Sequence, residues 1–367
     1  MSLLPYFAPA FGIDEPTAGH TISLYALGVV IGAPVIAVLS ARLPRRALLI
    51  GLMLLFALGN GLSALAPSYG WLLAFRFLSG LPHGAYFGVA ALVAAGLAPP
   101  NRRARAVSQV VAGLTIATVA GVPLANWLGQ VVGWRWGFAV AAGLAALTAL
   151  LVALFAPRDA APKGASPLRE LGALRNRQVW LTLLTGAIGF GGLFSVYTYV
   201  ASTMTAVTGV SERLVPAVLA LFGVGMTLGN IVSGWAADRA LMRTAAGMML
   251  FNAAALALFP LAAHALPWLM LDILAIGFGG GVGVVLQTRL MDVAGEAQTL
   301  AAALHHSAFN VANAIGPWLG GLAIAAGYGW TSTGWVGSLL ALAGVLVLGI
   351  AAWDMRRTAA QGAAGRG

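Results

Sequence analysis

The sequence contains no cysteine and few charged residues, which make up 8% of its 367 positions. Without cysteine, neither a disulfide framework nor thiol chemistry is available to the protein. A soluble domain carries roughly a quarter charged residues, so this chain is unable to cover itself with a surface that faces water. The first thirteen residues hold no Lys or Arg. The basic segment that opens a cleavable signal peptide is therefore absent from them.

Apolar residues make up 60% of the sequence, and its mean hydropathy is +0.90. A helix needs about 20 apolar residues to cross the hydrocarbon core of a bilayer. Eleven segments of about that length are separated by charged residues or by Pro and Gly; they lie at 17–41, 47–66, 70–97, 106–129, 134–156, 179–206, 214–237, 244–263, 267–288, 298–325 and 333–353. We therefore expect an all-α membrane protein with the lipid bilayer as a partner.

The apolar segment at 1–12 is long enough for only half a span. At 1.5 Å per residue, twelve residues cover about 18 Å of a hydrocarbon core that is roughly 30 Å thick. Half a helix would expose unpaired backbone groups to lipid. We expect a truncated first helix, with either an upstream start codon before Met1 or a shortened form of the protein.

The basic residues are distributed unevenly among the loops. We number twelve spans, with the half-length segment at 1–12 as the first. If the loops after the even-numbered spans face the cytoplasm together with the C-terminus, that side holds 17 of the 20 Lys and Arg residues. Arg135 and Arg213 remain on the other side, and Arg76 lies within a span. This bias predicts the orientation, with a cytoplasmic C-terminus. Because the basic residues sit in separate short loops, the net charge of +10 does not indicate a nucleic-acid partner.

An internal repeat divides the chain into two halves. The segment from Gly32 to Arg42 matches the segment from Gly229 to Arg239, 197 positions later. A polar stretch at 157–178 lies between the halves. Duplicated halves predict two six-helix bundles with pseudo-two-fold symmetry. The expected parts are an N-terminal bundle at 1–156, a cytoplasmic linker at 157–178, a C-terminal bundle at 179–355 and a cytoplasmic tail at 356–367.

Several motifs resemble those of the major facilitator superfamily. The repeated G-x8-[D/A]-R pattern before a basic loop resembles its loop signature, and Arg76 to Gly80 resembles its R-x-x-x-G motif. The fifth span carries Gly113, Gly121 and Pro123, which resemble the glycine-proline motif of proton-driven exporters. The stretch from about residue 3 to 353 is similar to the arabinose-efflux branch of 12-span drug:proton antiporters.

The resemblance implies alternating access in a bacterial cytoplasmic (inner) membrane, by a monomer whose two bundles rock about a central cavity. It implies a small organic substrate (a sugar, a nucleoside or a drug-like molecule), protons as the coupling ion and no cofactor. The sequence departs from the family at Ala41, where the loop motif normally carries an acid and the repeat keeps Asp238, and at Asn126, where a glycine is usual. An acidic residue in the family's first helix, a candidate proton carrier, would lie upstream of Met1.

Candidate cavity residues lie on three spans. Arg76, His83 and Phe87 share one helix stripe, because seven residues turn a helix by nearly two full turns. A charged side chain such as Arg76 has a high free-energy cost at membrane depth. Arg76 therefore acts either in the cavity, as a proton relay or substrate contact, or in packing, by hydrogen bonds to backbone carbonyls of a neighbouring helix. An aromatic stripe in the seventh span is either a binding surface or part of the packing; it consists of Phe190, Phe194 and Tyr197. A polar stripe in the eleventh span either lines the cavity or forms interhelical hydrogen bonds; it consists of His306, Asn310 and Asn313.

Asp272 lies near the outer end of the tenth span. It is either a titrating proton carrier or an interfacial acid in contact with water, and we favour the interfacial position. Gln287 and Arg289, at the other end of the same span, are interpreted as gate or interface residues. The expected gate residues are Arg42, Asp238 and Arg239, with Asp238 facing the positive N-terminal end of a helix near 105–109. The expected helix-packing residues are Gly113, Gly121, Pro123, Gly316 and Pro317.

The sequence shows no metal-ligand spacing, phosphate-binding loop or Ser/His/Asp arrangement. We therefore expect no metal and no enzymatic activity, and a proton-coupled exporter as the function. A sugar or metabolite importer or facilitator is the alternative within transport. A receptor or scaffold without transport activity is the remote alternative, because the longest loop is only about 22 residues long.

Overall fold

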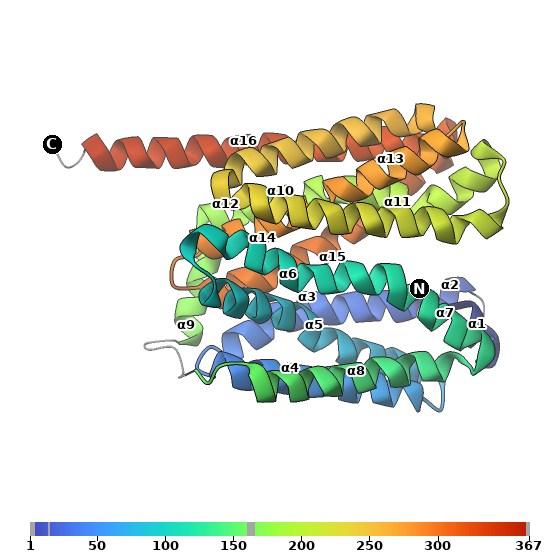
Figure 1. Cartoon of the computed structure of the whole chain (residues 1–367), viewed down its shortest axis with the longest axis horizontal. Coiled ribbons are helices and arrows are strands. Elements are labelled where there is room, and N and C mark those ends of the chain that lie inside the picture. The colour runs from blue at the N-terminus through green and yellow to red at the C-terminus, as the bar shows by residue number, and fades with distance from the viewer. Residues whose placement is uncertain (1–3, 14, 160–165, 365–367) are drawn as a thin grey trace. The chain divides into compact units, whose positions relative to one another are not determined.

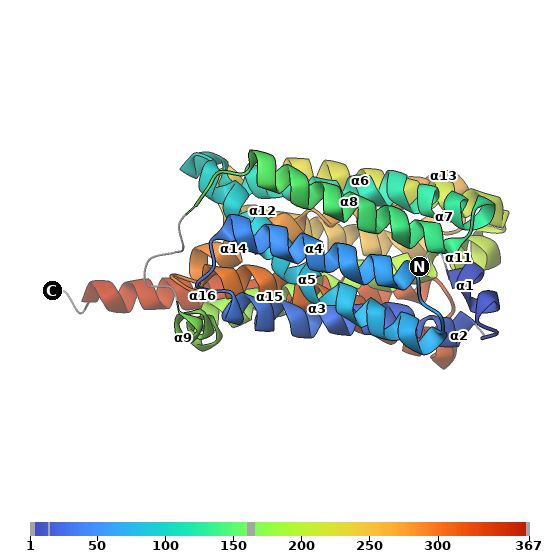
Figure 2. The same cartoon turned by 90° about the horizontal axis from the view of Figure 1, so that it is seen from below.

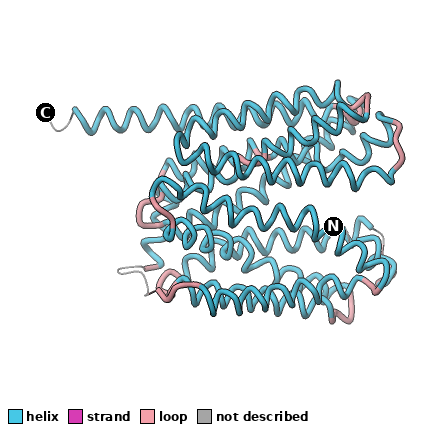
Figure 3. Tube along the Cα trace, in the orientation of Figure 1, coloured by secondary structure: helices cyan, strands magenta, loops and turns pink. Residues whose placement is uncertain are grey.

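The computed structural model describes residues 4–13, 15–159 and 166–364. Helices joined by short loops make up these residues, and no strand occurs among them (Figure 3). The expected all-α class is confirmed. This outcome follows from the sequence, because helices satisfy every backbone hydrogen bond within one segment and the chain has too few polar residues to face water.

The first half of the chain forms helices of very different length (Figure 1). Two are short: α1 (Leu4–Ala10) lies within the half-length first span, and α2 (Glu15–Ala18) follows it. The longer helices and the pieces that complete them are α3 (His20–Leu39), α4 (Arg45–Ala64), α5 (Tyr69–Leu97), α6 (Arg103–Ile116), α7 (Val122–Val131) and α8 (Trp134–Phe155). A π-helical turn at Ala117–Gly121 joins α6 to α7 within the fifth expected span.

A short linker helix, α9 (Pro167–Glu170), precedes the second half. The helices that follow are α10 (Arg177–Gly189), α11 (Gly191–Thr203), α12 (Val215–Ala262), α13 (Leu266–Gly279), α14 (Val282–Val293), α15 (Gln298–Ala323) and α16 (Ser332–Ala364). The pairs α10 with α11 and α13 with α14 each form one expected span.

Ten helices in the described part of the chain are long and apolar enough to cross a membrane. The 48-residue α12 is one of them, but its backbone leaves the helical conformation at Ala240 (φ −154°, ψ 71°). It folds back there, and its two arms correspond to the two separate segments that the hydropathy pattern predicts at 214–237 and 244–263 (Figure 1). The helices therefore match the expected segments.

Large apolar side chains are exposed along these helices. Leu154 is 65% exposed, Trp318 63% and Leu346 70%, and each lies inside a candidate span. A soluble protein rarely leaves a continuous apolar surface in water. Lipid is the solvent in which such side chains are stable.

The described residues divide into two compact units. Unit 1 is drawn from residues 1–93, 117–173 and 296–307, and unit 2 from 94–116, 174–295 and 308–367. In unit 1, α4 and α8 pack side by side (Figures 1 and 2). Each unit also takes a segment from the other half of the sequence. The expected boundaries at 157–178 and 355 stay a prediction.

Glycines at repeated positions bring helices together in the same way in both units. In unit 1, a Cβ on Gly28 would collide with the carbonyl of Phe77, and one on Gly80 with the carbonyl of Tyr25. In unit 2, Gly225 and Gly277 face the carbonyls of Leu274 and Phe222. Each of these four residues in unit 2 lies 197 positions after its counterpart in unit 1. The internal repeat thus corresponds to a repeated helix contact.

Candidate functional site

The close contact between α3 and α5 places Tyr25 beside Arg76 and His83. The Tyr25 hydroxyl lies 2.7 Å from Nδ1 of His83. The guanidinium carbon of Arg76 lies 4.8 Å from the centre of the Tyr25 ring. The face of an aromatic ring attracts a cation, so the ring favours the charged form of Arg76 in a poorly hydrated place. One tyrosine therefore contacts both titratable side chains, through its ring and its hydroxyl.

Arg76 has further contacts in unit 1. Its Nη1 donates to Oδ1 of Asn60 on α4 at 3.1 Å, and its guanidinium carbon lies 4.9 Å from the centre of the Phe138 ring on α8. These contacts are with side chains. The alternative of a lock on backbone carbonyls finds no support in the hydrogen bonds recorded for Arg76 among the described residues.

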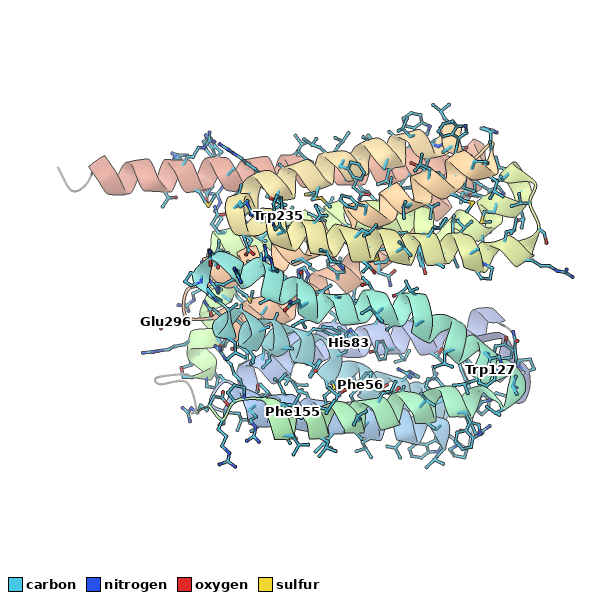
Figure 4. All side chains as sticks on the ribbon, in the orientation of Figure 1. Phe56, His83, Trp127, Phe155, Trp235 and Glu296 are labelled. Atoms are coloured by element: carbon cyan, nitrogen blue, oxygen red, sulfur yellow. The ribbon has the colours of Figure 1, made fainter. Side chains whose placement is uncertain are left out.

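His83 also adjoins α15, a helix from the second half of the sequence. The ring centres of His83 and His306 are 6.1 Å apart, and Phe87 lies 5.2 Å from His306. Small residues permit this approach, because a Cβ on Gly88 would lie 2.7 Å from the backbone nitrogen of Ala303. Phe56 on α4 also lies near His83, at 6.4 Å between ring centres (Figure 4).

We call Tyr25, Asn60, Arg76, His83 and His306 the polar cluster. Three of its members, Arg76, His83 and His306, are predicted cavity residues, and their roles stay predictions. Arg76, His83 and His306 are only partly buried, so their side chains keep some surface open. Tyr25 and Asn60 were missed, because nothing in the sequence near them distinguishes a cluster residue from a packing residue.

The aromatic stripe of the seventh span has a different environment. Phe190 is 1% exposed, and its ring centre lies 3.9 Å from that of Phe309. Phe194 and Tyr197 are partly buried, and the ring centre of Tyr197 lies 4.5 Å from that of Phe222. Phe190 is thus a core residue of unit 2, which favours the packing interpretation for it. Binding roles for Phe194 and Tyr197 stay predictions, as they do for the partly buried Asn310 and Asn313 of α15.

Asp272 is more deeply buried than an interfacial position implies. It is 7% exposed, and its Oδ2 has no hydrogen-bond partner among the described residues. Its neighbours along a cavity of about 580 Å³ between α12 and α13 are apolar, among them Phe251, Leu258 and Trp268. The low exposure favours an enclosed carboxyl over one in contact with water, and the choice between a proton carrier and an interfacial acid stays a prediction.

Arg289 belongs to a polar network at one end of unit 2. Its Nη2 donates to Oε1 of Gln178 at 2.7 Å, and its Nε to Oγ1 of Thr182 at 3.1 Å. Gln178 in turn donates from Nε2 to Oδ2 of Asp354 at 2.7 Å. The network ties α14, α10 and α16 together. This geometry gives Arg289 a structural contact, whereas Gln287 is buried with no partner for its side-chain amide among the described residues.

The expected gate acid contacts a helix terminus. Oδ1 of Asp238 accepts a hydrogen bond from the backbone N–H of Ala104 at 2.8 Å, in the first turn of α6. Ala104 lies one residue before the expected range. Arg42 and Arg239 are exposed, and Arg239 lies over the ring of Trp235 at 3.8 Å. Arg103, beside Ala104, forms an ion pair with Asp292 at 2.9 Å.

The helix-packing residues divide into two groups. A Cβ on Gly316 would collide with the carbonyl of Gly191, so Gly316 sits at a close contact between α15 and α11. The carbonyl of Pro317 accepts from the Tyr199 hydroxyl at 2.9 Å. Gly113 has no described neighbour within 4 Å of where a Cβ would lie, and Gly121 has only the Cβ of Ala117 at 3.7 Å. The side chain of Pro123 lies outside the described residues, and packing roles for Gly113, Gly121 and Pro123 stay predictions.

No group of three His, Cys, Asp or Glu side chains in the described part of the chain is placed to hold a metal ion. The site therefore consists of hydrogen-bonding, cationic and aromatic groups that meet between helices.

Comparison with known proteins gives a consistent result. The sequence model of the Major Facilitator Superfamily matches residues 1–294 and 193–367. The chain is 38% identical to the inner membrane transport protein YdhP of Escherichia coli K12, over 93% of this chain and 88% of that protein. It is 34% identical to a chloramphenicol resistance protein of Streptomyces lividans, over 94% and 89% of the two chains.

A crystal structure of the E. coli fucose:proton symporter has a similar fold. Its TM-score is 0.76 at 16% identity, over 95% of this chain and 93% of that one. The resemblance inferred from the motifs is confirmed, as is the fold class. The chain therefore belongs to the Major Facilitator Superfamily, and it is a multi-pass inner-membrane transporter and not an enzyme.

Proposed function

We propose that the protein exports a small organic molecule from the cytoplasm in exchange for protons, by alternating access, with its C-terminus in the cytoplasm. Its polar cluster is the proposed proton-handling and substrate-contact site. Arg76 supplies a fixed positive charge, and the Tyr25–His83 pair supplies a hydrogen-bonded route for a proton. Histidine is suited to this role because it exchanges a proton near physiological pH in an ordinary environment.

One observation carries this proposal: the repeat contains the same helix contact without the polar cluster. Tyr25, Arg76 and His83 correspond, 197 positions later, to Phe222, Ile273 and Gly280. The glycines that hold α3 against α5 also hold α12 against α13. Since unit 2 packs these helices without an arginine, tyrosine or histidine, packing alone does not account for the residues present in unit 1. A buried polar group that stability does not require supports a functional role.

The export direction has separate support. The motif of Gly113, Gly121 and Pro123 resembles that of proton-driven exporters, and one relative is a chloramphenicol resistance protein. The experiment is susceptibility and metabolite-export profiling of a deletion strain and an overexpressing strain. Export predicts that the deletion strain accumulates one class of small molecule in the cytoplasm and the overexpressing strain depletes it. A deletion strain that instead fails to take up a metabolite would contradict export and favour the importer alternative.

A further inference from the structure

Two acidic side chains hold the N-terminal turns of two helices. Asp238 Oδ1 accepts from the Ala104 N–H at 2.8 Å, in the first turn of α6. Glu170 Oε2 accepts from the Leu300 N–H at 2.8 Å, in the first turn of α15. The first four N–H groups of a helix have no partner within that helix, so an outside acceptor is needed where they are buried. We call these contacts the Asp238 clasp and the Glu170 clasp.

The two held N–H groups are equivalent in the repeat. Leu300 lies 196 positions after Ala104, close to the offset of 197 between Gly28 and Gly225. Both residues are 1% exposed. Each clasp also bridges the sequence: Asp238 comes from the second half and holds a helix of the first half, and Glu170 comes from the linker and holds a helix of the second half. The Asp238 clasp lies within unit 2 and the Glu170 clasp within unit 1.

The two acids, in contrast, are not equivalent in the repeat. The position 197 residues before Asp238 is Ala41, which is 5% exposed. A methyl side chain accepts no hydrogen bond. If the repeat alone supplied the acceptors, the buried N–H of Leu300 would be left unpaired, and a buried unpaired donor is costly.

The linker brings a carboxylate to this place. Its helix α9 begins after Ser166, whose hydroxyl oxygen accepts from the Arg169 N–H at 3.2 Å, and it packs against α3, the helix that ends just before Ala41. Glu170, the last residue of α9, is 6% exposed. Arg169 forms an exposed ion pair at 3.5 Å with Glu296, just before α15 begins.

We propose that Glu170 replaces the acid missing at Ala41, so that the linker is a working part of the cytoplasmic gate. The carboxyl group of Glu170 faces the positive end of α15, as that of Asp238 faces the positive end of α6. Glu170 is a positioning residue: it holds α15 against the helices of unit 1 and contacts no substrate. The word gate rests on the alternating access proposed above, but the clasp itself is testable without transport.

The experiment uses single-cysteine variants, since the chain has no cysteine of its own. Ser307→Cys places a thiol two turns after Leu300 on α15, where Ser307 is 8% exposed and its hydroxyl contacts the carbonyl of Val30. Ser108→Cys is the matched probe one turn after Ala104 on α6, where Ser108 is 4% exposed. The rate of maleimide labelling is measured in the purified full chain, without substrate and without a proton gradient.

Glu170→Ala should raise the labelling rate at Ser307→Cys by roughly two- to thirtyfold, the range expected when a helix terminus loses the carboxyl group that faces it. The rate at Ser108→Cys should stay unchanged. Adding Ala41→Asp to Glu170→Ala should return the rate at Ser307→Cys to its original value, because it restores the repeat's own acid.

Unchanged labelling at Ser307→Cys would overturn the proposal, and so would an equal rise at both probes, which indicates general loosening. Failure of Ala41→Asp to restore protection would overturn the replacement of one acid by the other. If Glu170→Ala lowers the yield of folded protein, the melting temperature of the double variant Glu170→Ala with Ala41→Asp is measured. A melting temperature restored to that of the unmodified protein supports the proposal, and one that stays low contradicts it. Because no transport is measured, these outcomes do not depend on whether the exporter assignment is correct.

Discussion

The hydroxyl of Tyr25 on α3 lies 2.7 Å from Nδ1 of His83 on α5, and the ring of the same tyrosine lies beneath the Arg76 guanidinium. Tyr25→Phe removes the first contact and keeps the second. We expect proton-coupled transport to fall sharply while the melting temperature in detergent changes little, because one hydrogen bond contributes about 0.5–1.5 kcal/mol to stability. Transport in vesicles and thermal melting check both parts.

Tyr199→Phe is the matched control for that variant. It removes a hydroxyl hydrogen bond of 2.9 Å to the carbonyl of Pro317, outside the polar cluster. Transport should stay near that of the unmodified protein. An equal loss of transport in the two variants would show that any hydroxyl hydrogen bond between helices has this effect. It would contradict a specific role of Tyr25 in proton coupling.

Gly80 is expected to be one of the least replaceable residues of α5. In Gly80→Ala the new Cβ would collide with the Tyr25 carbonyl, so α3 and α5 must separate. Overpacking of this kind costs about 1–3 kcal/mol, and the melting temperature should fall. Gly113→Ala is the control, since no described atom lies within 4 Å of its new Cβ. A mid-helix Gly→Ala change at an open site is stabilising by roughly 0.5–1 kcal/mol, so its melting temperature should hold or rise.

Asp238→Asn tests the Asp238 clasp. The amide oxygen still accepts a hydrogen bond from Ala104, but the negative charge facing the terminus of α6 is lost. Such a charge is worth about 0.3–1 kcal/mol when exposed and up to about 2 kcal/mol when partly buried. We therefore expect faster thiol labelling at Ser108→Cys, by a few-fold to about thirtyfold. Labelling that does not change would contradict a gating role for this charge.

The Glu170 clasp should depend on pH. Burial raises the pKa of the Glu170 carboxyl above its usual range, against the lowering effects of the Leu300 N–H, of Thr299 and of the Arg45 charge. The clasped state therefore holds a proton more tightly than an open state in which the carboxyl faces water. It follows that the clasp is strongest below the ordinary carboxyl pKa and weakens as the pH rises through the raised one.

Labelling of Ser307→Cys across a pH series checks this dependence, after correction for thiolate formation with Ser108→Cys in the same series. The other charged groups near the clasp are Arg45, Arg169 and its partner Glu296. Glu170→Gln removes the titrating group and should abolish the pH dependence. A dependence that persists in Glu170→Gln would assign it to one of these other groups.

The sequence predicts the spans well because membrane helices are set by local composition. Each of the eleven apolar segments corresponds to a helix, a pair of helix pieces or one arm of α12. Helix periodicity also predicts that Arg76 and His83 share a face. The partner of Asp238 is predicted to within one residue, because the positive end of a helix follows a basic loop.

The contacts between distant segments are where prediction from the sequence fails. Tyr25 reaches His83 only because Gly28 and Gly80 remove two Cβ atoms, and one sequence gives no sign of which glycines face each other. The internal repeat carries some of this information, because it aligns Tyr25 with Phe222 and Arg76 with Ile273 and so shows that the two halves differ at these positions. Glu170 was missed because a four-residue helix in a linker has no hydrophobic period that fixes its direction. The low exposure of Asp272 was not predicted, because the hydropathy pattern does not show which face of α13 is covered.

Proton release from acid-loaded inside-out vesicles measures whether the polar cluster couples protons to substrate movement. Addition of a substrate found by the profiling should alkalinise the vesicle interior with the unmodified protein. With Arg76→Ala the response should fall about tenfold or more, because a hydrogen bond to a charged group is worth about 1.5–3 kcal/mol, and Arg76→Lys should also be impaired. Ile273→Ala, at the repeat position, should keep the response. A folded Arg76→Ala protein that releases protons at the rate of the unmodified protein would contradict proton coupling by the polar cluster.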